Sequence, residues 1–103
     1  MKKDIFENYV KLICKRLGVT QEELFTKNKR RDLADARQLL YYMCFNHKMQ
    51  VAHIKKYMLD NGYYVQHPTV IHGIKEIQKK MIDDYDYVRV INELNDAVSL
   101  SIA

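Results

Sequence analysis

Apolar residues recur at steps of three and four over most of the chain, the spacing that gathers them on one face of an α-helix. The first such stripe predicts a helix over residues 5–17 that ends at Gly18, a common C-terminal cap. A capping box over residues 20–23 then opens a short helix that carries Leu24 and Phe25. The first stripe consists of Ile5, Phe6, Tyr9, Val10, Ile13, Cys14 and Leu17.

Three later stripes predict longer helices. The first starts after Asp32, a residue that caps helix N-termini well, and loses its period over residues 45–48. The second covers residues 50–61, and the third covers residues 67–82 with Pro68 in its first turn, where the missing N–H is not needed. Their inward-facing residues are, in order, Leu33, Ala36, Leu39, Leu40, Met43 and Cys44, then Val51, Ile54, Met58 and Leu59, then Val70, Ile71, Ile74, Ile77 and Met81.

A last stripe near the C-terminus predicts an amphipathic helix over about residues 85–100. Residues 83–86, Asp-Asp-Tyr-Asp, are either a break before it or a continuation of the preceding helix. With 3 Gly and 1 Pro among 103 residues, chain breakers are too few for a protein of short strands and turns. We therefore expect one all-α domain of five or six helices over residues 1–103. The last stripe consists of Val88, Ile91, Leu94 and Val98.

The charges are distributed unevenly along these predicted helices. Residues 1–31 hold nine Lys/Arg against four Asp/Glu, residues 32–82 hold seven against four, and residues 83–103 hold one against five. A basic body with an acidic end is typical of a surface that binds a polyanion, with the terminal helix kept away from it. The alternative is a solvated surface whose asymmetry arose by chance.

Several functional classes have no support in the sequence. The three glycines are too scattered to form a phosphate-binding loop, and no nucleophile stands in a recognisable arrangement with a base, so we expect neither an enzyme nor a cofactor. His67 and His72 diverge on their helix, and no Cys/His/Asp set has zinc spacing. No apolar run can span a membrane, and no secretory leader follows the charged start. Cys14 and Cys44 lie in apolar stripes, as in the reduced core of a cytoplasmic protein.

The helices predicted over residues 50–61 and 67–82 are joined by a short turn that contains Gly62, as in a helix-turn-helix. In such a unit the second helix enters the major groove of DNA and its first residues reach base edges. Here those residues include Gln66, His67 and Thr69. The same pair of helices also occurs in proteins that never contact DNA, so the pattern alone leaves both readings open.

The segment His67-Pro68-Thr69-Val70-Ile71-His72-Gly73 resembles the signature His-Thr-Thr-Val-Leu-His-Ala of the C-terminal DNA-binding domain of the DnaA replication initiator. The resemblance extends over about residues 9–82. That family is all-helical, is related to Trp-repressor-like folds, and reads short double-stranded DNA boxes. Upstream residues that follow the family in order and nearly in spacing are Leu17-Gly18-Val19-Thr20, Leu24, the cationic residues 27–31, Ala34 and Arg37-Gln38.

The resemblance implies which residues contact DNA. Residues 66–69 would meet base edges in the major groove, and the basic loop (residues 27–31) would contact phosphates or the minor groove. In an ungapped match the family's minor-groove arginine falls on Lys29, with the two arginines after it as alternatives. Arg37 would contact a phosphate, and His72 would pack or face a phosphate. The implicated residues are Lys27, Lys29, Arg30, Arg31, Arg37, Gln66, His67, Pro68, Thr69 and His72.

Two of these roles, those of the basic loop and of His67, have alternatives that involve no DNA. The basic loop could be merely solvated, although four closely spaced cations repel one another unless an anion offsets them. His67 could hydrogen-bond to the backbone at the start of its helix. The pairs Tyr41-Tyr42 and Tyr63-Tyr64 could stack on the bases of a single strand, but packing against the core is the simpler reading.

The chain departs from the family in the lead-in segment (residues 63–66). Tyr63-Tyr64-Val65-Gln66 replaces Gly-Gly-Arg-Asp, so the arginine is lost and the aspartate becomes Gln66. Aspartate accepts a hydrogen bond from cytosine, whereas glutamine can pair bidentately with adenine, so we expect a different base preference. The helix-turn-helix is about three residues longer than in the family, and Pro68 replaces a threonine.

We therefore expect a double-stranded DNA-binding protein that selects its sequence and acts in replication control or transcriptional regulation. Since no segment resembles the initiator's ATPase module, service to a phage or mobile element is one expected setting. The alternative is a protein-interaction module whose helix over residues 85–100 docks a partner or a second copy. One positive face formed by the basic loop and residues 66–69 would favour DNA. Scattered basic residues beside an open apolar groove would favour a protein partner.

Overall fold

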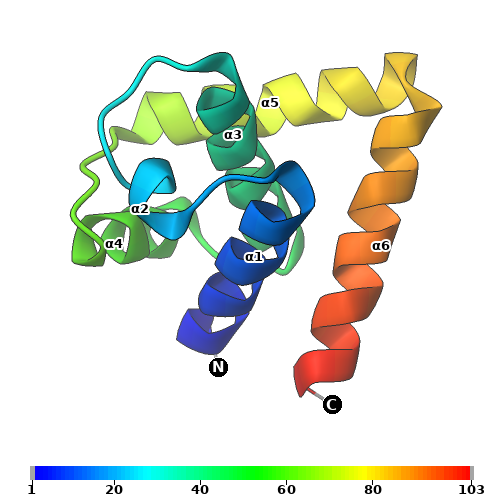
Figure 1. The fold of residues 1–103 in the computed structure, drawn as a ribbon, viewed down its shortest axis with the longest axis horizontal. Helices are drawn as coiled ribbons and strands as arrows, with labels where there is room; N and C mark the ends of the chain where they lie inside the picture. The colour runs from blue at the N-terminus through cyan, green and yellow to red at the C-terminus, as the bar shows by residue number, and fades with distance from the viewer. Residues whose placement is uncertain (1, 103) are drawn as a thin grey trace.

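The computed structural model describes residues 2–102, and for residues 101 and 102 it describes the backbone alone. Over that range the chain is helical and contains no strand, which confirms the expected all-α class. Its helices are α1 (Lys2–Leu17), α2 (Gln21–Leu24), α3 (Arg31–Asn46), α4 (Val51–Asp60), α5 (His67–Asp83) and α6 (Tyr85–Ile102) (Figure 1).

Most helix ends lie where the local sequence predicts them. Gly18 follows α1 with a φ of +70°, a conformation that glycine adopts without steric cost. The Thr20 hydroxyl accepts the Glu23 N–H, and the Glu23 carboxylate accepts the Thr20 N–H, both at 3.0 Å, so the capping box does open α2. Asp84 has an extended conformation and separates α5 from α6, which settles the open question there in favour of a break.

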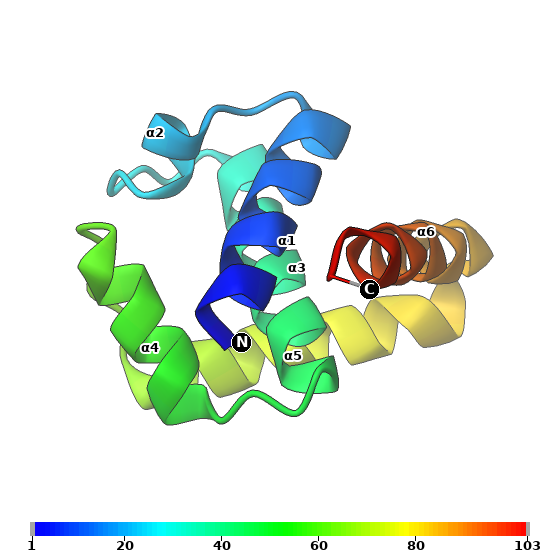
Figure 2. The same ribbon diagram turned by 90° about the horizontal axis from the view of Figure 1, so that it is seen from below.

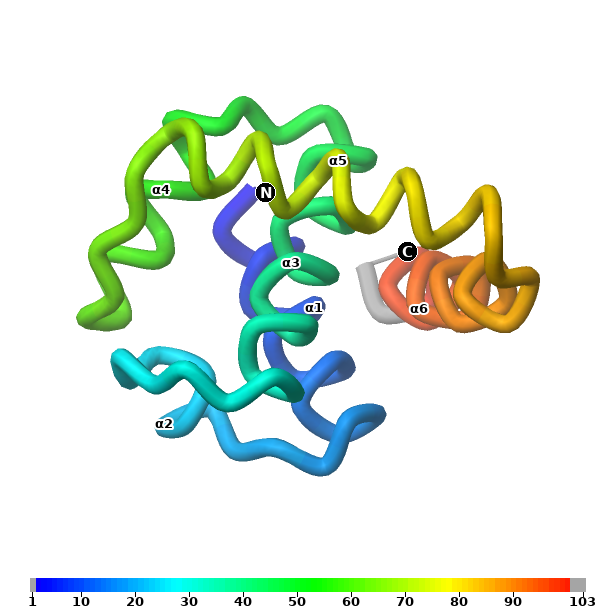
Figure 3. The backbone as a smooth tube through the Cα atoms, turned by 90° about the horizontal axis from the view of Figure 1, so that it is seen from above, coloured from blue at the N-terminus to red at the C-terminus, as the bar shows by residue number. Residues whose placement is uncertain are grey.

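α3 lies at the centre of the molecule, with α1 on one side and α5 on the other (Figures 2 and 3). Apolar side chains from all six helices bury one core around it. The prediction of a core position is wrong for two residues: Leu17 is 39% exposed and Leu59 is 57% exposed. Leu17 is the last residue of α1, where the chain turns away. Leu59 follows the fully buried Met58 and is rotated about 100° from it around α4, which turns it toward solvent.

α6 begins at the far end of α5 and runs back beside α1 (Figure 1). Three of the four residues in its predicted stripe are buried: Ile91, Leu94 and Val98. The Tyr9 hydroxyl donates to Oδ1 of Asn95 at 3.0 Å and lies 2.7 Å from Nδ1 of His47, so it links α1, α6 and the end of α3. The apolar stripe of α6 is therefore covered by helices of the same chain.

Features typical of metal-binding, disulfide-linked and membrane-spanning proteins are absent from the part of the chain that the structure describes. No group of three His, Cys, Asp or Glu residues there is arranged to hold a metal ion. Cys14 and Cys44 are both buried as free thiols, and burial raises the pKa of each. Among the helices α1 to α6, none is long and apolar enough to cross a bilayer.

Candidate nucleic-acid interface

The first turn of α5 presents its side chains to solvent. Gln66 is the N-cap in an extended conformation, and its carbonyl accepts the N–H groups of Thr69 and Val70 at 3.1 and 3.2 Å. Its side chain makes no capping hydrogen bond, and residues 66–69 are all exposed. Within residues 2–102 the His67 ring has no hydrogen bond to the backbone, so nothing supports that alternative. The Gln66 carbonyl is thus engaged in the helix, while the polar side chains of this turn are exposed.

The opposite face of α5 is packed closely on α3. Val70, Ile74 and Ile77 are buried there, together with Gly73. A Cβ added at Gly73 would lie 3.0 Å from Cδ2 of Tyr41 and 3.4 Å from Cα of Gln38, so an alanine there would require the tyrosine ring to shift by a few tenths of an ångström. This packing sets how far the first turn of α5 projects from the molecule.

His72 lies on the outer face of α5, one turn beyond Thr69. Its side chain is 68% exposed, and its Nε2 lies 3.9 Å from the Glu76 carboxylate. The packed position that sequence left open for His72 is therefore not the one observed.

The helix that follows the basic loop, α3, begins earlier than the sequence predicted. Arg31 already lies in α3 and Arg30 is the N-cap, so Asp32 is not the cap but a residue of the first turn. The Asp32 carboxylate instead pairs with the Arg30 guanidinium, accepting from Nε at 3.1 Å and from Nη2 at 2.8 Å. It also accepts the Leu33 N–H at 2.9 Å.

Arg30 has a second carboxylate partner, which restricts its availability further. Its Nη1 lies 2.6 Å from Oε2 of Glu23. Hydrogen bonds from Arg30 lower the pKa of Asp32, and the Thr20 N–H followed by Arg30 lowers the pKa of Glu23. Lys29 and Arg31 have no such carboxylate partner among the described residues. Of the three cations that the family match allowed for the minor groove, these two are the ones available.

Arg37 is not exposed where a phosphate could reach it. The residue is 5% exposed, and its guanidinium donates to four backbone carbonyls. Two of these carbonyls end α2 and two lie in the chain that follows it, and a guanidinium with five donors in a fixed plane can bind several of them at once. This corrects the expected phosphate contact: Arg37 supports the basic loop from inside. The acceptors are Leu24 at 2.8 Å, Thr26 at 2.6 Å, Asn28 at 3.1 Å and Glu23 at 3.3 Å.

The basic loop is in direct contact with the lead-in segment. Lys27 Nζ donates to the Tyr64 carbonyl at 2.7 Å and lies 4.2 Å from the centroid of the Tyr63 ring. All three views show the two segments side by side at one end of the molecule, while the acidic helix α6 lies at the other (Figures 1, 2 and 3). The basic loop and the segment that leads into α5 thus adjoin at one end of the molecule, with Arg37 packed beneath the loop.

Sequence reasoning did not single out the contact that Tyr63 makes with the loop. Its ring is half-buried, with Lys27 Nζ on it and with Cζ of Arg37 4.6 Å from its centroid. The sequence marked this position by the departure of the lead-in segment from the family pattern and by the Tyr63-Tyr64 pair, but neither feature indicated a contact with the loop. Gly73, where the family has alanine, was marked in the same way by its place in the signature.

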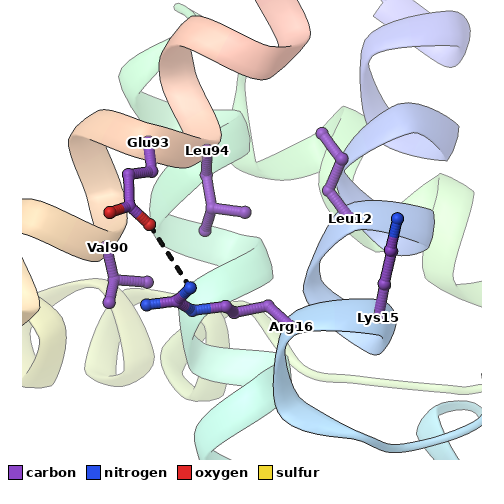
Figure 4. A pocket seen from close by; sticks show the side chains of 6 residues that line it. All are labelled: Leu12, Lys15, Arg16, Val90, Glu93 and Leu94. Atoms are coloured by element: carbon purple, nitrogen blue, oxygen red, sulfur yellow. Dashed lines mark ion pairs between the residues drawn. The ribbon is translucent and has the colours of Figure 1, made fainter.

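A second surface feature is a groove between α1 and α6. Its volume is about 410 Å³. Arg16 and Glu93 face each other across it, with Nη1 and Oε2 3.4 Å apart (Figure 4). The groove is separate from the face formed by the basic loop and α5. Its lining residues are Leu12, Lys15, Arg16, Val90, Glu93 and Leu94.

Comparison with known proteins relates most of the chain to one family. The family described as "Bacterial dnaA protein helix-turn-helix" matches residues 6–77. The chain is also 28% identical over 94 residues to the chromosomal replication initiator protein DnaA of Chlorobaculum tepidum. That alignment covers 91% of this chain but 18% of the relative, so the chain spans only a small part of that protein's length.

Proposed function

The chain belongs to the family of the bacterial DnaA helix-turn-helix, and from that premise we propose that it binds double-stranded DNA. The observation that carries the proposal is the contact of the basic loop with the lead-in segment. It joins Lys27, the first residue of the loop, to the segment that leads into the exposed first turn of α5. A helix start and a cationic loop on one face suit a duplex, because the helix fits the major groove while the cations meet neighbouring phosphates.

Selection of sequence would come from the first turn of α5. Gln66 has an uncommitted amide and is extended ahead of the helix, where it can pair with the N6 and N7 edge of adenine. His67 and Thr69 add groups that can donate or accept hydrogen bonds. Pro68 contributes apolar contact only, since it has no donor. We propose that these side chains read bases and that adenine is favoured opposite Gln66.

Positioning on the duplex would come mainly from the loop. Lys29 and Arg31 are the cations that we assign to phosphates or to the minor groove, since Arg30 is held by two carboxylates. Lys27 reaches the same face at the lead-in segment. His72, exposed one turn along α5, is assigned to a phosphate.

The relative from Chlorobaculum tepidum is a replication initiator, and we propose that this chain acts in replication control or in transcriptional regulation at sites of a related kind. Service to a phage or mobile element is the setting we propose. The alternative, docking of a partner through α6, is weaker because the stripe that would dock is buried in the chain's own core. The groove beside α6 carries no feature that identifies an occupant.

Selection of bound duplexes from a random pool, followed by fluorescence anisotropy, tests the proposal. We expect a defined site to emerge and binding to weaken steeply with salt. About five phosphate contacts correspond to a log–log slope of about −4 to −5. Failure to bind any duplex at low ionic strength, or binding that does not change with salt, would reject the proposal. Binding without an enriched sequence would retain DNA binding and reject the selectivity.

A further inference from the structure

Tyr63 stands where the resembled family has the first glycine of its lead-in. Glycine has no side chain, so the contacts of this ring belong to this chain rather than to the family pattern. Lys27 Nζ lies 4.2 Å and Arg37 Cζ lies 4.6 Å from the ring centroid, both within the range of a cation–π interaction. The ring is half-buried and packs against the core, so its position is defined on the side away from solvent.

The two cations on the ring are each tied to a second group. Arg37 donates to the carbonyl of Thr26, just before the basic loop, and to that of Asn28, within the loop. Lys27 donates to the Tyr64 carbonyl in the lead-in segment at 2.7 Å. These contacts form a continuous path that links the loop backbone to the lead-in segment. The path runs through Arg37, the Tyr63 ring and Lys27 to the Tyr64 carbonyl. Gln66, the N-cap of α5, follows two residues later.

This path joins the two elements to which DNA contact is assigned. Without it, the loop would be connected to α5 only through the helices beneath, and its mutually repelling cations would favour more open arrangements. The path also brings the Lys27 ammonium to the Tyr64 carbonyl in the lead-in segment.

We propose that Tyr63 is a positioning residue that holds the basic loop at a fixed place relative to the first turn of α5. The protein would then accept only one spacing between the base pairs read by α5 and the duplex segment contacted by the loop. The inference rests on the proposed DNA binding. One added base pair moves the two contacted regions apart by about 3.4 Å and rotates them by about 34°, which a loop held in this way would not follow.

Duplexes with altered spacing test this inference. The selected site is footprinted to locate the base pairs contacted by each element, and one base pair is then added or removed between them. We expect the wild-type protein to bind the altered duplexes about tenfold more weakly, the cost of roughly one mismatched base pair. Tyr63→Leu and Tyr63→Gly remove the ring and should lose most of that discrimination.

Two substitutions at neighbouring or identical positions serve as matched controls. Tyr63→Phe keeps the ring face that both cations contact, and it should preserve the spacing preference. Tyr64→Leu changes a 58% exposed side chain in the same segment but keeps the backbone carbonyl to which Lys27 donates, and it should preserve the preference as well. Loss of discrimination in the Tyr64 variant would show that any change in this segment has the effect and would overturn the role of the ring.

Lys27→Met provides a test that leaves the packed ring in place. Lys27 is exposed, so this variant should fold, lose affinity for all duplexes and also lose spacing discrimination. The double variant with Tyr63→Leu should lose no more discrimination than either single variant, because both break the same path. Additive losses would overturn the inference.

The outcomes separate this inference from the proposed function. A wild-type protein that binds no duplex refutes the proposed function, and the inference with it. A wild-type protein that binds its site but tolerates every spacing, or a Tyr63→Leu variant that discriminates as well as wild type, refutes the inference while DNA binding stands. Thermal unfolding of each variant, run beforehand, sets a temperature at which all of them are folded.

Discussion

Arg37→Lys keeps the positive charge at this position but changes the number and geometry of its hydrogen-bond donors. An exposed phosphate contact would tolerate the change, since a lysine ammonium binds phosphate well. The structure instead shows a guanidinium inside the protein that donates through three nitrogens to four carbonyls. A single ammonium nitrogen cannot reach acceptors distributed around that planar group, so the two roles lead to different outcomes.

The loss of stability can be worked from those hydrogen bonds. Lysine can keep one or two of the four, and hydrogen bonds to a charged group each contribute about 1.5–3 kcal/mol. Only the bond to Leu24 is fully buried, so water can partly replace the others. We therefore expect the free energy of unfolding to fall by about 2–4 kcal/mol. For a domain of this size that corresponds to a fall in Tm of roughly 10–25 °C.

Thermal and urea unfolding followed by circular dichroism, without DNA, measure this loss directly. Arg31→Lys is the matched control, because Arg31 is exposed in the first turn of α3 and should change stability by no more than about 0.5 kcal/mol. A Tm for Arg37→Lys within about 3 °C of the wild type would contradict the structural role. The phosphate contact would then be the better account of this arginine.

Three further predictions concern the loop and α5. In anisotropy titrations, Lys29→Ala should weaken binding to all duplexes and flatten the log–log salt slope by about one unit. Arg30→Ala removes a cation that is already paired with two carboxylates, so it should change the salt slope much less. Equal changes in slope would contradict the distinction between Lys29 and Arg30. Gln66→Ala should leave Tm nearly unchanged and reduce the difference in binding free energy between selected and scrambled duplexes by about 1–3 kcal/mol. Ile74→Ala should instead lower the free energy of unfolding by about 2–5 kcal/mol. Full discrimination between the duplexes by the Gln66 variant would show that Gln66 reads no base. Gly73→Ala should lower Tm, because the new Cβ would lie 3.0 Å from the buried ring of Tyr41. This cost should outweigh the helix propensity of alanine, which is about 1 kcal/mol better than that of glycine. A raised Tm would show that the Tyr41 ring can move aside.

The sequence by itself determined the helices and most of their ends. Apolar periodicity, the capping box at Thr20 and the glycine after α1 act through neighbours within about one turn, so they can be read without knowing the fold. The same locality explains the failures. Leu17 and Leu59 fit the apolar stripes, but whether a stripe residue is covered depends on what lies opposite it.

The family was also accessible from the sequence, because the signature at the start of α5 and the basic loop agree with it in order and nearly in spacing. The sequence did not show which cations of the loop are free of carboxylate partners. Arg30 is held by Glu23 and Asp32, whereas Lys29 has no such partner within residues 2–102. The composition of the loop is the same in either case, and only the path of the backbone decides which carboxylate meets which cation.

Contacts between distant segments were decided by the tertiary structure alone. Arg37 reaches carbonyls 9 to 14 positions earlier in the chain, and Lys27 reaches a carbonyl 37 positions later. Every residue has a carbonyl, so such acceptors leave no trace in the sequence. The stripe of α6 shows the same limit, because its periodicity specifies an apolar partner without saying which one. Packing beside α1 made that partner the chain itself.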